Sequence, residues 1–161
     1  MIYNTQKILK ASDETIQDIV NDGLRRYGRR ADLNYIDVSI VTDMSYLFYN
    51  VDFNGDVSKW NTSNVRYMYS MFELSTFNGK VSSWDISKVI DMSHMFAESN
   101  FNRSINRWDL RHIKKIDMLF NTHYDKEITR DEDLKEMFGN SYNDYIDRLN
   151  TKLLCKLIDD E

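Results

Sequence analysis

The sequence predicts an α+β repeat protein, in which a short β-solenoid of about four coils lies between two α-helical caps. A repeat of 24 residues in the middle of the chain, and an amphipathic helical pattern on each side of it, predict this fold. The 161 residues suffice for one compact domain. We expect an N-terminal cap over residues 1–28, a solenoid over 29–128 and a C-terminal cap over 129–161.

Eight columns of residues recur at the spacing of 24 in three successive units. The columns are Phe53, Phe77 and Phe101; Asn54, Asn78 and Asn102; Val57, Val81 and Ile105; Trp60, Trp84 and Trp108; Val65, Val89 and Ile113; Met68, Met92 and Ile116; Met71, Met95 and Leu119; Phe72, Phe96 and Phe120. This period lies in the range of leucine-rich repeats, in which each unit forms one coil. The apolar columns should point inward, because one coil cannot bury its apolar face alone.

A degenerate unit precedes the complete ones, and half a unit follows them. The earlier unit consists of Leu33, Ile36, Asp37, Val41, Met44, Leu47 and Phe48, with Arg29 in the first phenylalanine column and Ile36 in the tryptophan column. Tyr124 and Ile128 end the array. In each coil we expect short β-strands equivalent to Val57–Trp60 and Val65–Met68, and an internal ladder of hydrogen-bonded asparagines.

The segments that flank the array show the helical period. Apolar residues recur with this period at Ile16, Ile19, Val20, Leu24 and Tyr27 in the first flank, and at Tyr142, Tyr145, Ile146, Leu149, Leu153 and Leu157 in the second. Ser12 is the expected N-cap of the first helix, and Gly28 its expected end. A shorter helix is expected over 131–138. Both flanks are interpreted as caps, because the ends of a solenoid expose strand edges.

The units FNGDVSKWNTSNVRYMYSMF and FNGKVSSWDISKVIDMSHMF resemble the BspA-type leucine-rich-repeat family. They share its phenylalanine-asparagine start, its Trp-Asp/Asn step and its Val-x-x-Met-x-x-Met-Phe end, and the likeness covers residues 29–128. The resemblance implies a β-strand solenoid that binds proteins and carries no catalytic residues. Members are best known as bacterial surface proteins, so the resemblance implies an extracellular location.

Composition and the N-terminus favour a different location. The first residues lack the apolar run of a signal peptide, and no stretch has the length of a membrane span. We therefore expect a cytoplasmic protein, or one packaged in a particle. The net charge of −5 argues against general polyanion binding. The single cysteine, Cys155, excludes an intramolecular disulfide and a cysteine-built metal site.

No constellation of residues predicts catalysis. His94, His112 and His123 fall in different repeat columns, and none has an Asp or Cys partner at a meaningful spacing. Cys155 lies among leucines and is expected to pack rather than react. The acidic run from residue 125 to residue 136 lacks the glycine and the glutamate of an EF-hand loop. We expect no enzyme activity, metal or cofactor.

Residues that break the repeat are the candidates for binding a partner. They are Tyr35, Tyr46, Tyr49, Tyr67, Tyr69, Asp91, His94, Lys114 and Lys115. Tyrosine gives a large contact area at low entropic cost, although these rings could instead cover the core edge or the N-terminal cap. Arg25, Arg26, Arg29 and Arg30 form a candidate patch for an anionic partner, or complement the C-terminal end of the first helix.

The sequence thus predicts a non-enzymatic module that binds a protein. Two alternatives stay open. One is a structural or assembly component of a phage or virus particle, which would form oligomers through its terminal helices. The other is an inhibitor or effector that binds a cellular enzyme or complex. Nucleic acid is not an expected partner, because the chain is acidic overall.

Overall fold

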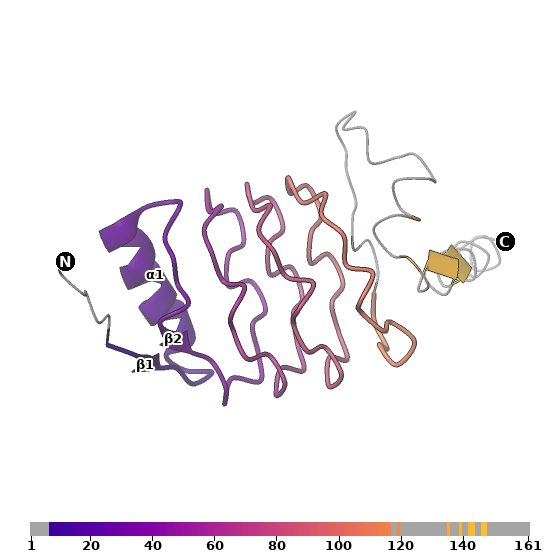
Figure 1. Cartoon of the computed structure of the whole chain (residues 1–161), viewed down its shortest axis with the longest axis horizontal. Coiled ribbons are helices and arrows are strands. Elements are labelled where there is room, and N and C mark those ends of the chain that lie inside the picture. Colours follow the sequence, from indigo (N-terminus) through magenta and orange to yellow (C-terminus); the bar gives the residue numbers. More distant parts are fainter. Residues whose placement is uncertain are drawn as a thin grey trace, which may run out of the picture.

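The computed structural model describes residues 7–116 and the isolated positions 119, 135, 139, 142, 143, 146 and 147. Its elements are β1 (Leu9–Lys10), α1 (Ile16–Tyr27) and β2 (Ile36–Asp37), and β1 pairs with β2 in parallel. After these elements the chain winds into coils that lie side by side, with α1 against the first of them (Figure 1).

The repeat of the sequence is the repeat of the structure. Four isolated parallel bridges join residues 24 positions apart: Asp32 and Asp56, Asp43 and Tyr67, Tyr67 and Asp91, and Asp91 and Lys115. Each coil therefore takes 24 residues, as predicted. The chain has a repeat fold.

The predicted strands are wrong in extent. The strand predicted over Val65–Met68 is reduced to a single bridge residue, Tyr67. The strand predicted over Val57–Trp60 is absent, and a single bridge residue, Asp56, lies just before that segment. At the Asp56 bridge the reason is the side chain of the bridge residue itself. The Asp56 carboxylate accepts the N–H of Ser58 at 2.9 Å. Such an aspartate turn bends the chain at once and prevents a longer ladder.

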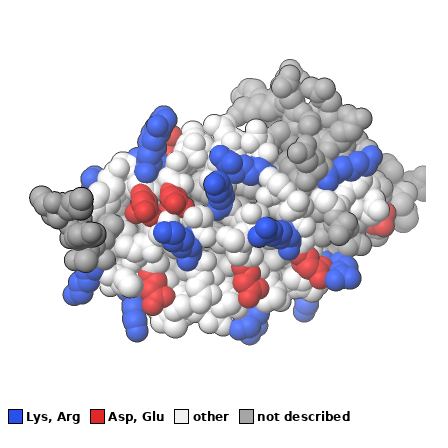
Figure 2. All heavy atoms as spheres, viewed as in Figure 1, with Lys and Arg blue, Asp and Glu red and all other residues white. Residues whose placement is uncertain are grey.

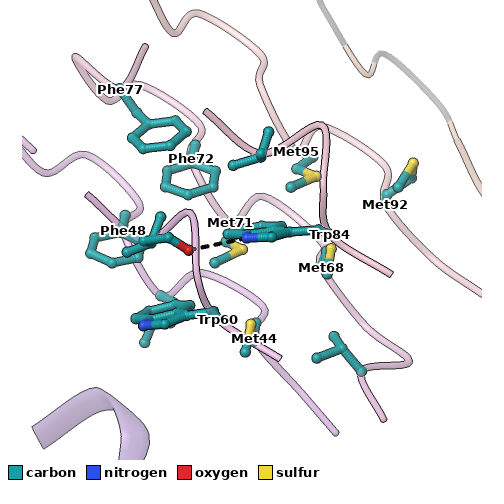
Figure 3. Close-up of a cluster of buried hydrophobic side chains, with 14 of the residues drawn as sticks. Met44, Phe48, Trp60, Met68, Met71, Phe72, Phe77, Trp84, Met92 and Met95 are labelled. Atoms are coloured by element: carbon teal, nitrogen blue, oxygen red, sulfur yellow. Dashed lines mark hydrogen bonds between the residues drawn. The ribbon is translucent and has the colours of Figure 1, made fainter. Parts of the chain in front are cut away.

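Aromatic rings fill the core as continuous stacks. Phe48, Phe72 and Phe96 form one stack, with centroids 5.2 and 5.7 Å apart and planes within 3°. A second stack consists of Phe53, Phe77 and Phe101, with spacings of 5.9 and 6.2 Å. All six rings are buried, and the two stacks touch each other within a coil (Figure 3). The inward orientation predicted for these columns is confirmed.

The tryptophan column also carries a repeated hydrogen bond. The indole Nε1 of Trp60 donates to the Leu33 carbonyl at 3.0 Å, and that of Trp84 donates to the Val57 carbonyl at 3.1 Å (the latter dashed in Figure 3). Trp108 repeats the bond. Each buried indole thus satisfies its own N–H and one carbonyl of the preceding coil. This explains why the column holds tryptophan rather than another large apolar residue.

The asparagine ladder exists, but it is not internal. Asn54 Oδ1 accepts the N–H of Asn78 at 3.0 Å, and Asn78 Nδ2 donates to Asn102 Oδ1 at 2.8 Å. Asn54 and Asn102 are exposed and Asn78 is half-buried, so the ladder lies on the surface. The short asparagine side chain reaches the adjacent coil without entering the core.

The N-terminal segment covers the first coil. α1 buries Ile16 and Val20, and it ends at Gly28, whose φ of 75° and N–H bond to the Leu24 carbonyl confirm the predicted stop. Its start differs from the prediction. Thr15 holds the N-cap position, whereas the Ser12 hydroxyl donates to a carboxylate oxygen of Glu14 at 2.6 Å.

The predicted C-terminal cap falls almost entirely outside the described residues, as do Phe120, Tyr124 and Ile128. Two described residues of its predicted apolar face, Tyr142 and Ile146, pack half-buried against the core.

Asp13 supplies the first coil with the hydrogen-bond acceptor that each later coil receives from the coil before it. In a later coil, the N–H groups of Arg66 and Tyr67 share the Thr42 carbonyl of the coil before, at 2.7 and 3.2 Å. Thr42 and Asp43 lie in the first coil, and Asp13 Oδ1 accepts their two N–H groups at 2.7 and 3.1 Å. Thr42 Oγ1 donates to Asp13 Oδ2 at 2.7 Å. The carboxylate therefore takes the position of a peptide carbonyl and satisfies the end of the ladder.

Replacing Asp13 with alanine should lower the free energy of unfolding by about 1–2 kcal/mol, as the loss of a helix cap does. Partial burial raises the pKa of Asp13, but the hydrogen bonds from Thr42 and Asp43 outweigh it and hold that pKa below 3.8. A pKa lowered by folding means that the stabilisation is present above the unfolded-state pKa and is lost as pH falls through the folded-state pKa.

Asp13→Asn keeps an oxygen acceptor without the titration. We expect its melting temperature to fall less than that of the wild type between about pH 5 and pH 2, measured by circular dichroism. Parallel pH profiles for the two proteins would contradict this role for the carboxylate.

Candidate binding surface

Four side chains form a continuous ring cluster on the surface, called here the tyrosine cluster: Tyr46, Tyr49, Tyr69 and His94. The Tyr46 ring meets Tyr49 edge to face at 5.7 Å and Tyr69 at 5.1 Å, and Tyr69 meets His94 at 5.7 Å. Tyr46 is 51% exposed and Tyr49 is 41% exposed. Four of the sequence-predicted residues are thereby brought together across neighbouring coils.

Backbone geometry turns the cluster outward. Met68 is fully buried, whereas its neighbour Tyr67 is 40% exposed and its other neighbour Tyr69 is half-buried. Tyr46 and His94 occupy one repeat column and share a left-handed backbone, with φ of 62° and 59°. Desolvation, followed by a hydrogen bond and the charge of Tyr69, raises the pKa of Tyr46 above 10.0. The Tyr46 hydroxyl therefore stays protonated at physiological pH.

A column of polar and charged residues belongs to the same coils as the cluster. Asp43, Tyr67, Asp91 and Lys115 succeed one another at the bridge position, and Lys115 Nζ lies 3.7 Å from Asp91 Oδ2. Asp43 and Asp91 accept the N–H two residues ahead, at 2.8 and 3.0 Å. Tyr67 and Lys115 have no carboxylate to do so.

Tyr35 and Lys114 belong neither to the cluster nor to this column. Tyr35 is half-buried against α1, where a Cβ on Gly23 would lie 2.8 Å from its hydroxyl. Its ring contacts Tyr27 edge to face at 6.2 Å, and desolvation raises its pKa. Tyr35 therefore covers the N-terminal cap. Lys114 is exposed beside Lys115, outside the ring contacts.

The four arginines differ in their partners. Arg25 and Arg26 both pair with Asp22 on α1, and Arg29 pairs with Asp52 of the next coil at 3.2 Å. Arg30 instead lines a surface groove. Figure 2 shows charges of both signs interspersed over the face in view, with no broad basic area.

That groove was missed by sequence reasoning. It has a volume of about 520 Å³ and is lined by Arg30, Asn54, Asp56, Ser58, Asn78, Gly79, Lys80 and Arg103. A signal was present in the sequence: Lys80 stands where the two earlier coils have Asp32 and Asp56. The groove is therefore indicated by a column that loses its repeated aspartate, a kind of break that the tyrosines do not reveal.

Two of the three histidines lie in the described part of the chain. His112 Nε2 lies 2.9 Å from the Ile86 carbonyl, and His94 belongs to the tyrosine cluster. Among the described residues no three His, Cys, Asp or Glu side chains gather as metal ligands would. No helix among these residues has the length and apolarity to cross a membrane. His123 and Cys155 lie outside the described residues.

Comparison with known proteins places this repeat in a family. The sequence model of the family described as "Mycoplasma protein of unknown function, DUF285" matches residues 22–131. The chain belongs to this family. DUF285 is related to the BspA-like repeats of leucine-rich-repeat type, which agrees with the resemblance seen in the sequence. The matched residues include the tyrosine cluster and the groove. No curated protein and no solved structure matched the chain.

Proposed function

We propose that the chain is a leucine-rich-repeat-type solenoid that binds a protein partner through the tyrosine cluster, without catalysis. One observation carries the proposal: four ring side chains form a continuous, partly exposed cluster at positions where the repeat does not require them. The apolar columns already bury the core without these rings.

Tyrosines that support one another are suited to binding. Edge-to-face contacts at 5.1 and 5.7 Å hold Tyr46 in place, so little side-chain entropy remains to be lost on association. Tyrosine is enriched at the residues that dominate binding energy, because each ring offers apolar area and a hydroxyl. Asp91 and Lys115 then provide charges at the rim, where they influence the orientation and the rate of association.

The partner is identified by crosslinking from the cluster itself. A photoreactive phenylalanine analogue at position 49 would be irradiated in an extract of the producing cell, and mass spectrometry would identify the protein attached to it. The same analogue at Tyr27, a ring 53% exposed on α1, is the matched control. The proposal predicts a protein attached from position 49 and not from position 27.

A double variant tests the cluster together with Tyr67, an exposed ring two residues before Tyr69. Tyr46→Asn suits the left-handed backbone at that position, and Tyr67→Asp restores the residue type of Asp43 and Asp91 in its column. We expect this variant to melt like the wild type and to bind the crosslinked partner at least about 30-fold more weakly, the loss of one hot spot. Tyr27→Ala should bind as the wild type does.

Two results would reject the proposal. The first is undiminished affinity of the double variant. The second is a fixed assembly of identical chains in light scattering that the double variant dissociates, because the cluster would then join copies of this protein, as in an assembly component.

A further inference from the structure

The groove lined by Arg30, Lys80 and Arg103 crosses the coils rather than following one of them. Three adjacent columns supply all of its lining except Ser58. Arg30, Asn54 and Asn78 lie in one column, Asp56 and Lys80 in the next but one, and Gly79 and Arg103 in the column between them. At about 4.8 Å for each coil step, its long axis spans on the order of 15 Å. A linear ligand therefore fits it better than a compact one.

Glycine and asparagine give the groove its floor. A Cβ on Gly79 would lie 2.5 Å from the Phe77 ring, so the fold keeps this position free of a side chain. Asn78 donates its side-chain amide to Asn102, and its backbone carbonyl accepts the Nε–H of Arg103. The ladder bond leaves the amide group of each asparagine with further capacity for hydrogen bonds.

Positive charge predominates in the groove, although the chain as a whole carries −5. Among the described residues, neither Arg30 nor Lys80 forms an ion pair, and Arg103 bonds to a carbonyl. The one acid, Asp56, is engaged by the Ser58 N–H. Lys80 replaces the aspartate of its column and so gives up a turn bond while adding a cation.

The lining decides between classes of anionic ligand. No aromatic residue lines the groove, so bases would have nothing to stack on, and an apolar peptide anchor would have no pocket. Guanidinium groups bind sulfate-like and carboxylate groups through paired hydrogen bonds, and asparagine amides bind hydroxyl groups. We propose that this groove binds an acidic oligosaccharide, with its sulfate or carboxylate groups on the three cations and its hydroxyls on the asparagine ladder.

Isothermal titration calorimetry with a heparin-derived hexasaccharide tests the proposal. Lys80→Asp is the informative variant, because aspartate restores the turn residue of the column and should keep the fold intact. We expect it to weaken binding at least about tenfold, as the loss of one hydrogen bond to a charged group does. Lys88→Asp makes the same change of charge at an exposed position outside the groove and should bind nearly as the wild type does.

Three outcomes would overturn the assignment. Absence of binding by the wild type would reject the site. Equal weakening in Lys80→Asp and Lys88→Asp would reduce the effect to net charge. A single-stranded oligonucleotide of the same charge that binds as tightly would reject the oligosaccharide class. The variant with Tyr46→Asn and Tyr67→Asp should bind the hexasaccharide normally, because the groove and the tyrosine cluster share no residue.

Discussion

Replacing Trp84 with alanine should lower the free energy of unfolding by about 3–5 kcal/mol, the usual cost of removing a buried tryptophan. Trp84 is 4% exposed, stacks on Trp60 at 6.3 Å and donates its indole N–H to the Val57 carbonyl. The truncation leaves a cavity between two coils and a buried carbonyl without a donor. Because small domains are stable by only about 5–15 kcal/mol, much of the fold's stability would be lost.

Urea unfolding of Trp84→Ala and Trp84→Phe separates the contribution of the buried ring from that of its hydrogen bond. Phenylalanine keeps a large ring but has no donor, so its deficit should be smaller and should include the bond to the Val57 carbonyl. Ile40→Ala, at a side chain that is 63% exposed, should change stability by less than about 0.5 kcal/mol. A Trp84→Ala protein within that same range would show that the ladder does not stabilise the array.

Replacing Gly55 with alanine should destabilise the protein by about 3 kcal/mol, at the upper end for overpacking, and one methyl group suffices to do it. The added Cβ would lie 2.1 Å from the Ala31 carbonyl oxygen and 2.4 Å from the Phe53 ring. Neither is the free end of a flexible side chain: one is the backbone of the adjacent coil, and the other belongs to a buried stack. Adjacent coils would have to move apart.

Gly28 serves as a control, because its backbone conformation requires glycine there and crowding does not. Its φ is 75°, but no atom lies within 4 Å of a Cβ placed there. Gly28→Ala should therefore cost about 1–3 kcal/mol from backbone strain alone, because a φ of 75° with a ψ of −172° is a conformation that essentially only glycine adopts. Melting temperatures from scanning calorimetry would compare the two variants. A loss for Gly55→Ala well below that of Gly28→Ala would mean that crowding between coils is not what requires glycine at position 55.

Much of the fold could be predicted because the repeat acts through simple spacing. Any residue of the tryptophan or phenylalanine columns meets its equivalent 24 positions away, so the inward columns follow from the sequence alone. The long strands were predicted wrongly, since aspartates such as Asp43, Asp56 and Asp91 form a turn directly at the bridge position. Their side chains act over two residues, and this local effect outweighs the β-preference of valine and tryptophan nearby.

The candidate surfaces were predicted less completely. Breaks in the repeat identified Tyr46, Tyr69 and His94 as residues free for binding, and the structure brings them together. The same reasoning included Tyr35, which packs on α1. Spacing along the chain does not predict whether a tyrosine ring packs against α1 or stays exposed, because that depends on where the N-terminal helix lies.

By itself, the sequence determined the length of a coil, the residues that face inward and the stop of α1 at Gly28. These features depend on periodicity and on backbone preference, which act over one coil or less. Only the tertiary structure decided that Asp13 would serve as the carbonyl of an absent coil, and that Arg30, Lys80 and Arg103 would line one groove. The physical reason is that the stacking of coils brings together residues that lie far apart in the sequence. Which residues meet depends on the arrangement of several coils, and no local pattern in the sequence shows it.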